Sequence, residues 1–176
     1  MHMPSNSPAT AILERLAPQR WPLPLDLLPA GTVLVGGAVR DALLDRLKPQ
    51  PDLDLVVPSG ALALTRTLAN RLGGSCVVLD QERDMARLVV RGWTVDIARQ
   101  DGASLEADLQ RRDYSINAIA LPLNGPAQLI DPTGGLADLQ QGWLTAVRES
   151  NLTDDPLRLL RGLRLMAEIP LSLDPM

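Results

Sequence analysis

Two hydrophobic patterns alternate along the first half of the chain and predict a mixed α/β fold. Short, almost uninterrupted apolar runs alternate with longer leucine-rich stretches in which apolar residues recur three or four positions apart. The short runs are typical of buried strands, and the longer stretches are typical of helices that cover a sheet. The expected strands are residues 32–35, 53–57, 75–79, 86–90 and 94–98, and the expected helices are 9–17, 38–47 and 60–72.

The second half shows weaker patterns until its last helix. We expect a helix at 104–109, strands at 128–130 and 144–147, and a glycine-rich turn at 131–135. The last helix is expected to be capped by Thr153 or Asp154, with Pro156 tolerated in its first turn. Its predicted apolar face consists of Leu159, Leu160, Leu163 and Met166.

Composition narrows the possible functions. A chain of 176 residues with 45% hydrophobic and 22% charged residues is typical of one globular domain. The net charge of -4 gives no general attraction to nucleic acid, so that partner requires local support. The single Cys76 and single His2 argue against a disulfide, a zinc finger and a histidine-based triad. Because no transmembrane or signal-peptide pattern is present, we expect a cytoplasmic protein without a membrane partner.

Asp52 and Asp54 are the first candidates for chemistry. They flank Leu53 at the start of a predicted strand, so strand alternation places both carboxylates on one face. Two like charges this close are costly unless a cation neutralises them, and a divalent cation prefers such oxygen ligands. The pair therefore predicts a Mg²⁺ site. Taken alone, the motif favours the alternative of a solvated strand end that carries two acids, so it requires support from other residues.

Gly36 and Gly37 form a candidate phosphate-binding turn. They end a predicted strand and precede a helix, where unhindered backbone N–H groups can receive phosphate oxygens, and Arg40 adds positive charge one turn later. The segment matches neither the P-loop nor the dinucleotide-binding fingerprint. A tight turn followed by a surface arginine is the alternative interpretation.

Asp96 is a candidate third carboxylate. It interrupts the apolar run 94–97, and an acid that faces inward there needs a partner, which a metal site would supply. The alternative is a surface strand with Thr94 and Asp96 turned outward. Asp80 and Asp84 are weaker candidates because they lie in a predicted loop.

The last helix carries a stripe of charged residues opposite its predicted leucine face. The stripe consists of Asp155, Arg158, Arg161 and Arg164, spaced by three positions. Arginine forks and an aspartate can bind a triphosphate or the edge of a nucleobase. The alternative is the solvated face of an amphipathic helix.

Five segments together resemble one family. They read LVGGAVRDALL, DLDLVV, RRDYSINAIAL, LIDPTGGLADL and TDDPLRLLRGLRL. Their order resembles that in the class II tRNA nucleotidyltransferase and bacterial poly(A) polymerase family, which includes the CCA-adding enzymes. The resemblance spans residues 32–168. It implies a head domain similar to the DNA polymerase beta nucleotidyltransferase fold, a small mixed sheet with packed helices, at 9–150. A disordered start at 1–8 and the beginning of a neck domain at 151–176 complete this expected organisation.

The resemblance also implies roles for the matched residues. Asp52 and Asp54 resemble the catalytic metal ligands, with Asp96 as the third catalytic carboxylate. The implied nucleotide contacts are Gly36, Gly37, Arg40, Arg112, Asp113, Asn117, Asp155, Arg158, Arg161 and Arg164. Among them, Asp155 and Arg158 resemble the pair that reads the incoming base, and residues 131–139 resemble the hinge between head and neck.

Some features depart from the family pattern. Asp154 stands where the family often has Glu, and Leu165 stands where a Phe is common. Family enzymes continue through neck, body and tail domains that hold the RNA, whereas this sequence ends at Met176. We therefore expect most of the RNA-binding surface to lie outside these residues.

The implied activity is template-independent transfer of CMP or AMP from CTP or ATP to an RNA 3′ end, with tRNA as the expected substrate. In this scheme the 3′-hydroxyl attacks the α-phosphorus between two Mg²⁺ ions. A noncatalytic nucleotide-binding module and a poly(A) polymerase are the alternatives, and a Rossmann oxidoreductase is a distant third. The motifs leave open whether CC, A, CCA or poly(A) is added.

Overall fold

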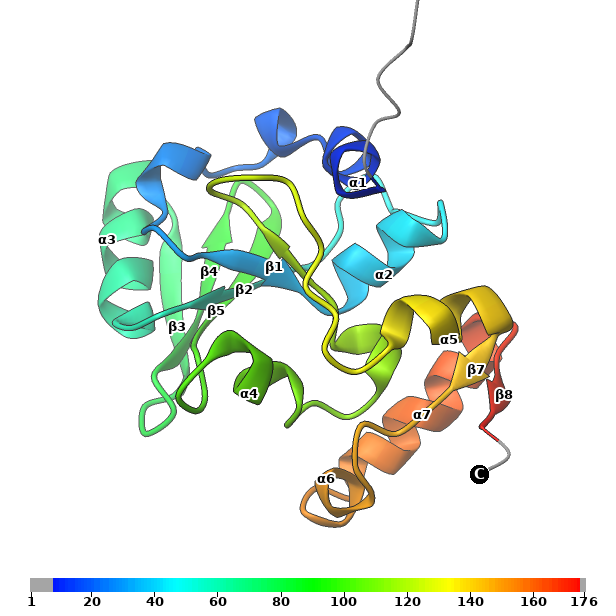
Figure 1. The fold of residues 1–176 in the computed structure, drawn as a ribbon. Coiled ribbons are helices and arrows are strands. Elements are labelled where there is room, and N and C mark those ends of the chain that lie inside the picture. Colours follow the sequence, from blue (N-terminus) through cyan, green and yellow to red (C-terminus); the bar gives the residue numbers. More distant parts are fainter. Residues whose placement is uncertain (1–7, 175–176) are drawn as a thin grey trace, which may run out of the picture.

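The computed structural model describes residues 8–174 and is built around a six-stranded mixed sheet (Figure 1). The strand order is β3–β4–β5–β2–β1–β6, in which β2 and β5 are parallel and the other neighbours are antiparallel. The strands are β1 (Val33–Val35), β2 (Leu53–Val57), β3 (Ser75–Asp80), β4 (Met85–Val90), β5 (Trp93–Arg99) and β6 (Ala120–Pro122). The predicted mixed α/β head-domain fold is confirmed.

Helices cover the sheet and extend from it at the C-terminal end. They are α1 (Pro8–Leu16), α2 (Gly37–Leu43), α3 (Ala61–Leu72), α4 (Leu105–Leu109), α5 (Gly135–Gln141), α6 (Glu149–Thr153) and α7 (Leu157–Glu168). Short 3₁₀ turns occupy Pro18–Arg20, Leu25–Leu27 and Ser115–Asn117. A small parallel pair, β7 (Trp143–Leu144) and β8 (Ser172–Leu173), lies beside α7 (Figure 1).

Strand β2 separates two apolar clusters because its side chains alternate between the faces of the sheet. Leu53, Leu55 and Val57 belong to the main core, into which α1, α2 and α3 also pack. Val56 points the other way and joins a smaller cluster with residues of β1, β6 and α4. Asp54 has the same strand parity as Val56, so it lies on the face opposite the main core. Because of this alternation, Asp52 and Asp54 do not point into the main core and can line a functional site on the opposite face of the sheet.

A third apolar cluster holds α7 against the rest of the chain. Tyr114 and Ile116 pack with Leu165 of α7 and with apolar residues around β7 and β8. Gly162 of α7 lies directly over Tyr114, whose hydroxyl donates a hydrogen bond of 3.1 Å to the carbonyl oxygen of Arg158. A Cβ at position 162 would lie 2.1 Å from that hydroxyl oxygen, so the close approach requires glycine.

The elements of the first half agree closely with the hydrophobic pattern, with one difference. The predicted helix 38–47 ends at Leu43, and Asp45 shortly after it has a φ of 56°. This left-handed conformation cannot continue a right-handed helix. Of the predicted disordered start, residues 1–7 lie outside the described part of the chain, whereas Pro8 begins α1.

In the second half of the chain, the predicted elements differ more from the structure. The predicted strand 128–130 is reduced to a single bridge between Ala120 and Ile130, and β6, α5 and α6 were not anticipated. The predicted strand 144–147 is replaced by the two-residue β7 and a bridge between Tyr114 and Ala146. These pairings join residues distant in sequence, which a local pattern does not reveal.

The start and the apolar face of the last helix also differ from the prediction. Thr153 belongs to α6 and Asp154 follows it, while the Asp155 carboxylate accepts a 3.1 Å hydrogen bond from the Leu157 amide at the start of α7. The leucines of the predicted apolar face are 52–65% exposed, and only Met166 of that set packs against the third cluster. The division between head and neck near residue 150 stays a prediction. Among residues 8–174, no helix has the length and hydropathy required to cross a membrane.

Candidate active site

A cavity of about 870 Å³ lies between the sheet, α2 and α7. It brings together most of the residues that sequence analysis proposed, although they come from five separate segments. Those that line it are Gly36, Gly37, Arg40, Asp52, Asp54, Asp96, Arg112, Asp113, Asn117, Arg161 and Arg164. Four of the five motifs therefore contribute residues to one site, together with Asp96, whereas the motif at residues 129–139 does not line it.

Asp54 and Asp96 lie side by side across the sheet. They are register partners on the parallel strands β2 and β5, and Asp52 precedes β2 by one residue. Asp96 in turn pairs in register with Arg87 of β4, whose Nε and Nη2 atoms donate to the two carboxylate oxygens at 2.6 and 2.9 Å. The bidentate geometry gives Asp96 a partner that the sequence did not identify.

Asp54 is held in an unfavourable environment for a negative charge. The pKa of its carboxyl is raised from 3.8 to about 6, chiefly by burial, and the neighbouring Asp96 and Asp52 contribute to this rise. Arg112 and Arg161 act on this pKa in the opposite direction. Within residues 8–174, no hydrogen bond or ion pair is formed by the carboxylate of Asp52 or Asp54. The pair therefore offers oxygen ligands whose charge lacks a close counter-ion.

Gly36 permits the glycine turn to approach Asp54. It has a φ of 75°, and a Cβ at this position would lie 2.9 Å from the Asp54 carboxylate oxygen Oδ2. A larger residue would be strained by the backbone and would crowd the carboxylate. Gly37 then begins α2. The turn and the aspartate thus form one compact wall of the cavity.

Arg40 is a buried part of this wall. The residue is 8% exposed, its Nε and Nη2 atoms contact Asp41 at 2.8 Å, and its Nη1 donates to the Asn117 side-chain oxygen at 2.8 Å. The alternative of a surface arginine is therefore wrong. Arg40 joins α2 to the 3₁₀ turn Ser115–Asn117, which fixes both Gly37 and Asn117 beside the cavity.

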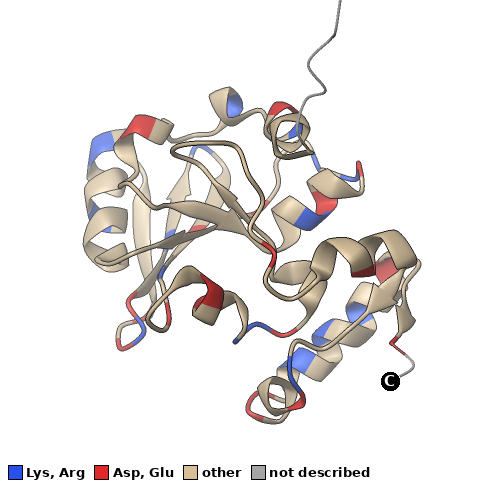
Figure 2. Ribbon diagram, viewed as in Figure 1, with Lys and Arg blue, Asp and Glu red and all other residues tan. Residues whose placement is uncertain are grey.

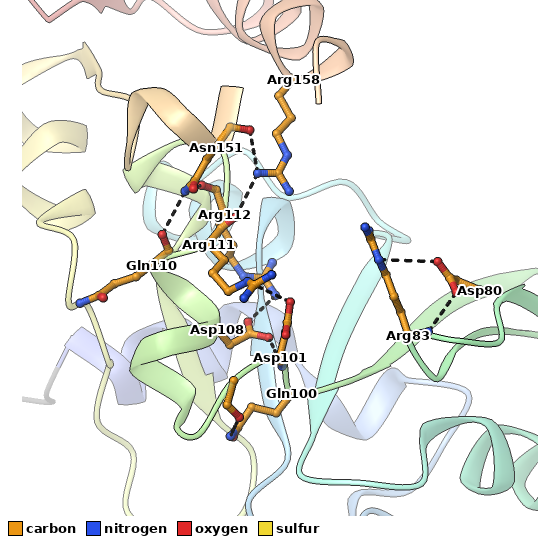
Figure 3. A network of polar contacts seen from close by, with 11 residues as sticks. Asp80, Arg83, Gln100, Asp101, Asp108, Gln110, Arg111, Arg112, Asn151 and Arg158 are labelled. Carbon is orange, nitrogen blue, oxygen red and sulfur yellow. Dashed lines mark hydrogen bonds and ion pairs between the residues drawn. The ribbon is translucent and has the colours of Figure 1, made fainter. Parts of the chain in front are cut away.

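Arg112 and Asp113 connect the opposite wall to neighbouring segments. Arg112 donates to Asp108 at 3.2 Å, as Figure 3 shows, while its Nε is buried and has no hydrogen-bond partner among residues 8–174. The Asp113 carboxylate accepts bonds from the Tyr114 amide and from Nη1 of Arg161, both at 2.8 Å. Because Asp113 belongs to the loop before β6, this loop fixes the position of Arg161 of α7.

The charged stripe of α7 is divided between two environments. Basic positions recur along α7 (Figure 2), and Arg161 and Arg164 line the cavity. Arg158 instead donates from Nη1 to the carbonyl oxygens of Arg111 and Asn151, each at 3.0 Å (Figure 3). Neither Arg158 nor Asp155 lines the cavity. Their assignment to base reading stays a prediction, because in this conformation both serve local structure.

The weaker carboxylate candidates have structural roles. The Asp84 carboxylate accepts hydrogen bonds from the Ala61 and Leu62 amides at 3.1 and 2.7 Å, which satisfies the N-terminus of α3. Asp80 accepts a bond from the Arg83 amide within the β3–β4 turn, and an ion pair joins the two side chains (Figure 3). Both acids are therefore excluded from the site by their local partners.

Sequence reasoning missed three cationic residues of the cavity. Arg87, Arg46 and Lys48 line it beside the predicted residues. Arg46 lies in the loop after α2 and donates from Nη2 to the carbonyl oxygen of Glu168 at 2.6 Å, so it bridges to the end of α7. A signal for Arg87 was present, because alternation in the strand 86–90 turns it away from the core side chains Ala86 and Leu88.

The residues fit a metal only as the pair Asp52 and Asp54. In the part of the chain that the structure describes, no group of three or more histidine, cysteine or acidic side chains is arranged to hold a metal ion. Asp96 is adjacent in register, but its oxygens are engaged by Arg87. The unpaired oxygens of Asp52 and Asp54 retain the chemistry that a hard cation prefers.

Comparison with known proteins identifies the family. A profile described as Poly A polymerase head domain matches residues 32–145. The chain belongs to this family. It is 51% identical over 157 residues to the CC-adding tRNA nucleotidyltransferase of Synechocystis sp., covering 89% of this chain and 38% of that protein. It is 41% identical over 152 residues to the A-adding tRNA nucleotidyltransferase of Deinococcus radiodurans, covering 86% of this chain and 34% of that protein.

Solved structures support the same assignment. A tRNA-processing enzyme with CTP is similar with a TM-score of 0.71 at 35% identity, covering 82% of this chain and 40% of the other. The Thermotoga maritima CCA-adding enzyme in complex with tRNA gives a TM-score of 0.72 at 34% identity, covering 82% and 35%. The chain thus spans well under half the length of the relatives that it matches.

Proposed function

We propose that this protein transfers CMP or AMP from CTP or ATP to the 3′ end of RNA, with tRNA as the substrate. One observation carries the proposal. Asp52 and Asp54 lie against a cavity that is also lined by the glycine turn and by arginines of α7. Relatives named as CC-adding and A-adding tRNA nucleotidyltransferases support this reaction and leave both nucleotides as candidates. A tRNA substrate also implies that the activity takes place in the cytoplasm.

The cationic wall is suited to a nucleoside triphosphate. Arg161 and Arg164 are exposed on α7, and Arg112 lines the same cavity. A triphosphate would supply acceptors to these guanidinium groups, which bind phosphate oxygens as planar forks. Each of the three guanidinium nitrogens of Arg40 already contacts Asp41 or Asn117, so we assign it chiefly to holding the glycine turn and Asn117 in place.

Asp52 and Asp54 would hold Mg²⁺, which when bound neutralises triphosphate charge and lowers the pKa of the attacking hydroxyl. The chain orients both carboxylates because β2 is paired on both sides, with β1 and with β5. Gly36 prevents steric crowding of Asp54. The arginines then stabilise the negative charge that develops as pyrophosphate leaves.

A noncatalytic nucleotide-binding module is the principal alternative. It would use the same cavity and the same arginines, but would transfer nothing. Poly(A) synthesis is a second alternative within the family, because the matching profile is described as a poly A polymerase head domain. These alternatives differ in product rather than in nucleotide binding.

The test is incubation of the longest natural form of the protein with tRNA lacking its 3′ CCA, with CTP or ATP supplied separately and then together. Product length distinguishes CC, A, CCA and poly(A) addition. Asp52→Ala should abolish addition, whereas Asp26→Ala, which removes an exposed acid far from the cavity, should leave it unchanged. Calorimetry with CTP supplies the second measurement. Binding of CTP without any addition would overturn the proposal in favour of a binding module.

A further inference from the structure

Arg87 is placed to contact a substrate as well as Asp96. Val77, Arg87, Asp96 and Asp54 are consecutive register partners on β3, β4, β5 and β2, so their side chains share one face of the sheet. The Asp96 side chain is 17% exposed, whereas that of Arg87 is 42% exposed. The guanidinium is therefore bonded to Asp96 on one side and remains accessible to solvent on the other.

The donors of Arg87 are only partly used. A guanidinium carries five N–H groups, and Asp96 accepts one from Nε and one from Nη2. Among residues 8–174, no other hydrogen bond or ion pair is formed by this side chain. Nη1 and the second N–H of Nη2 thus remain available to an anion, while the bond to Asp96 holds the fork in a defined orientation.

The position of Arg87 separates it from the other cations of the cavity. Within residues 8–174, the remaining cationic lining residues come from α2, the loop after it, the loop before β6 and α7. Figure 1 shows α2 and α7 away from the outer strands β3 and β4. Of the cations in the described part of the chain, Arg87 alone lines the cavity from that outer side, with the carboxylates between it and α2.

Two exposed apolar side chains accompany Arg87 on the same face. Val77 is its register partner and is 46% exposed, and Val89 lies two residues along β4 and is 39% exposed. Alternation in a strand gives positions 87 and 89 the same orientation. A cation flanked by exposed valines matches an RNA end, which combines phosphate charge with the apolar faces of ribose and base.

The proposed transfer requires two polyanions in one cavity, the nucleoside triphosphate and the RNA end. We propose that Arg87 binds a backbone phosphate of the RNA 3′ end, with Val77 and Val89 against its terminal nucleosides. This inference rests on the proposed function. It assigns the triphosphate to the arginines of α7 and the RNA to β4, so that the two substrates approach the aspartates from opposite sides.

The test measures RNA binding in metal-free buffer, independently of catalysis. The probe is a tRNA acceptor-stem minihelix lacking CCA, bound to the longest natural form of the protein and followed by fluorescence anisotropy. Arg87→Ala should weaken binding about tenfold and reduce the slope of log affinity against log salt by about 1, because one phosphate contact is lost. Arg87→Gln should behave similarly. Arg83→Ala removes an equal charge from the same hairpin and should leave the affinity unchanged.

A modified probe separates this role from a structural one. A neutral methylphosphonate is placed in turn at each of the last three linkages of the minihelix. At the linkage that Arg87 binds, wild-type protein should lose about tenfold in affinity, whereas the Arg87→Ala protein should lose none. Additive losses at all three linkages would overturn the inference, because Arg87 would then act only on Asp96.

Two further results distinguish the inference from the proposed function. Affinity for CTP, measured by calorimetry in each variant, should change less than twofold, and a large loss of CTP affinity with intact RNA binding would contradict the assignment of Arg87. Nucleotide addition by a protein whose RNA binding is insensitive to Arg87 would overturn this inference alone. Failure of the wild-type protein to bind the minihelix or to extend it would overturn both.

Discussion

The two helices that bring arginines to the cavity are held in different ways. Helix α2 follows a buried strand, and four of its seven residues are buried, including Arg40. Helix α7 has twelve residues, of which only Gly162 and Leu165 are buried. Its leucines Leu157 and Leu163 are 69% and 65% exposed. The same helical spacing of apolar residues therefore gives an interior helix in one place and an exposed one in the other.

This difference has a physical cause and a functional consequence. The side chains of α2 are covered by α1 and the sheet, so its arginine is fixed by bonds to neighbours that are also fixed. The cavity arginines of α7 lie on a helix held by the third apolar cluster and the contact of Gly162 with Tyr114, and Arg161 adds one ion pair to Asp113. We expect the α2 side of the cavity to be rigid and the α7 side to be easily displaced.

The largest effect on stability should come from the contact that holds α7. Gly162→Ala places a methyl group 2.1 Å from the Tyr114 hydroxyl oxygen, and overpacking of this kind should lower the free energy of unfolding by about 3 kcal/mol. Chemical denaturation measures the change. In a Tyr114→Leu background the added methyl no longer meets a hydroxyl, so the same substitution should cost much less. An equal cost in both backgrounds would show that this contact does not hold α7.

On the rigid side, removing the charge of Asp54 should stabilise the fold. Because burial raises its pKa to about 6, the ionised carboxylate opposes folding at pH 7, and Asp54→Asn should raise the free energy of unfolding by about 2 kcal/mol in metal-free buffer. The folded state binds the extra proton between about pH 4 and 6, so wild-type stability should fall as pH rises through that window. The Asn variant should lack this slope. An unchanged slope would mean that Asp54 is not the group responsible.

Arg40 and Arg164 should respond differently to truncation. Arg40→Ala leaves the buried Asn117 and the partly exposed Asp41 without their donor, and should lower the free energy of unfolding by about 1.5 kcal/mol. Arg164→Ala removes an exposed group paired with Glu168 at 3.7 Å, and should change stability by less than about 0.5 kcal/mol. In steady-state assays Arg164→Ala should instead raise KM for the nucleotide. Equal destabilisation by the two variants would remove the distinction between the helices.

The smallest effects should come from the exposed leucines of α7. Leu160→Gln and Leu163→Gln should each change the stability of the 176-residue chain by less than about 0.5 kcal/mol. Leu165→Ala, at a buried position of the same helix, should cost about 3 kcal/mol. Thermal and chemical denaturation of the three variants test this order. A large loss from either exposed leucine would show that α7 is covered on that face.

Agreement between sequence and structure was highest where burial is two-sided. Strand β2 has the predicted bounds because it is paired with a strand on each side and packs against the main core. Its apolar run is therefore stable only as a buried strand. Alternation placed Asp52 and Asp54 on one face of the strand, and the family resemblance singled them out as candidate metal ligands. The leucine face of α7 was interpreted as buried by the same reasoning, and it is exposed because packing goes through Gly162 and Leu165 instead.

The sequence by itself determined the strand and helix order of the first half, the family and the residues that could carry chemistry. These depend on periodicity, composition and motif order, all of which can be read from the sequence without knowing which distant residues come into contact. Only the tertiary structure decided the bonds of Arg40 to Asn117 and of Arg87 to Asp96, and the separation of Arg158 from the cavity. The free energy of each such contact depends on which distant backbone and side-chain atoms folding places within bonding distance, and on how much water it removes from them.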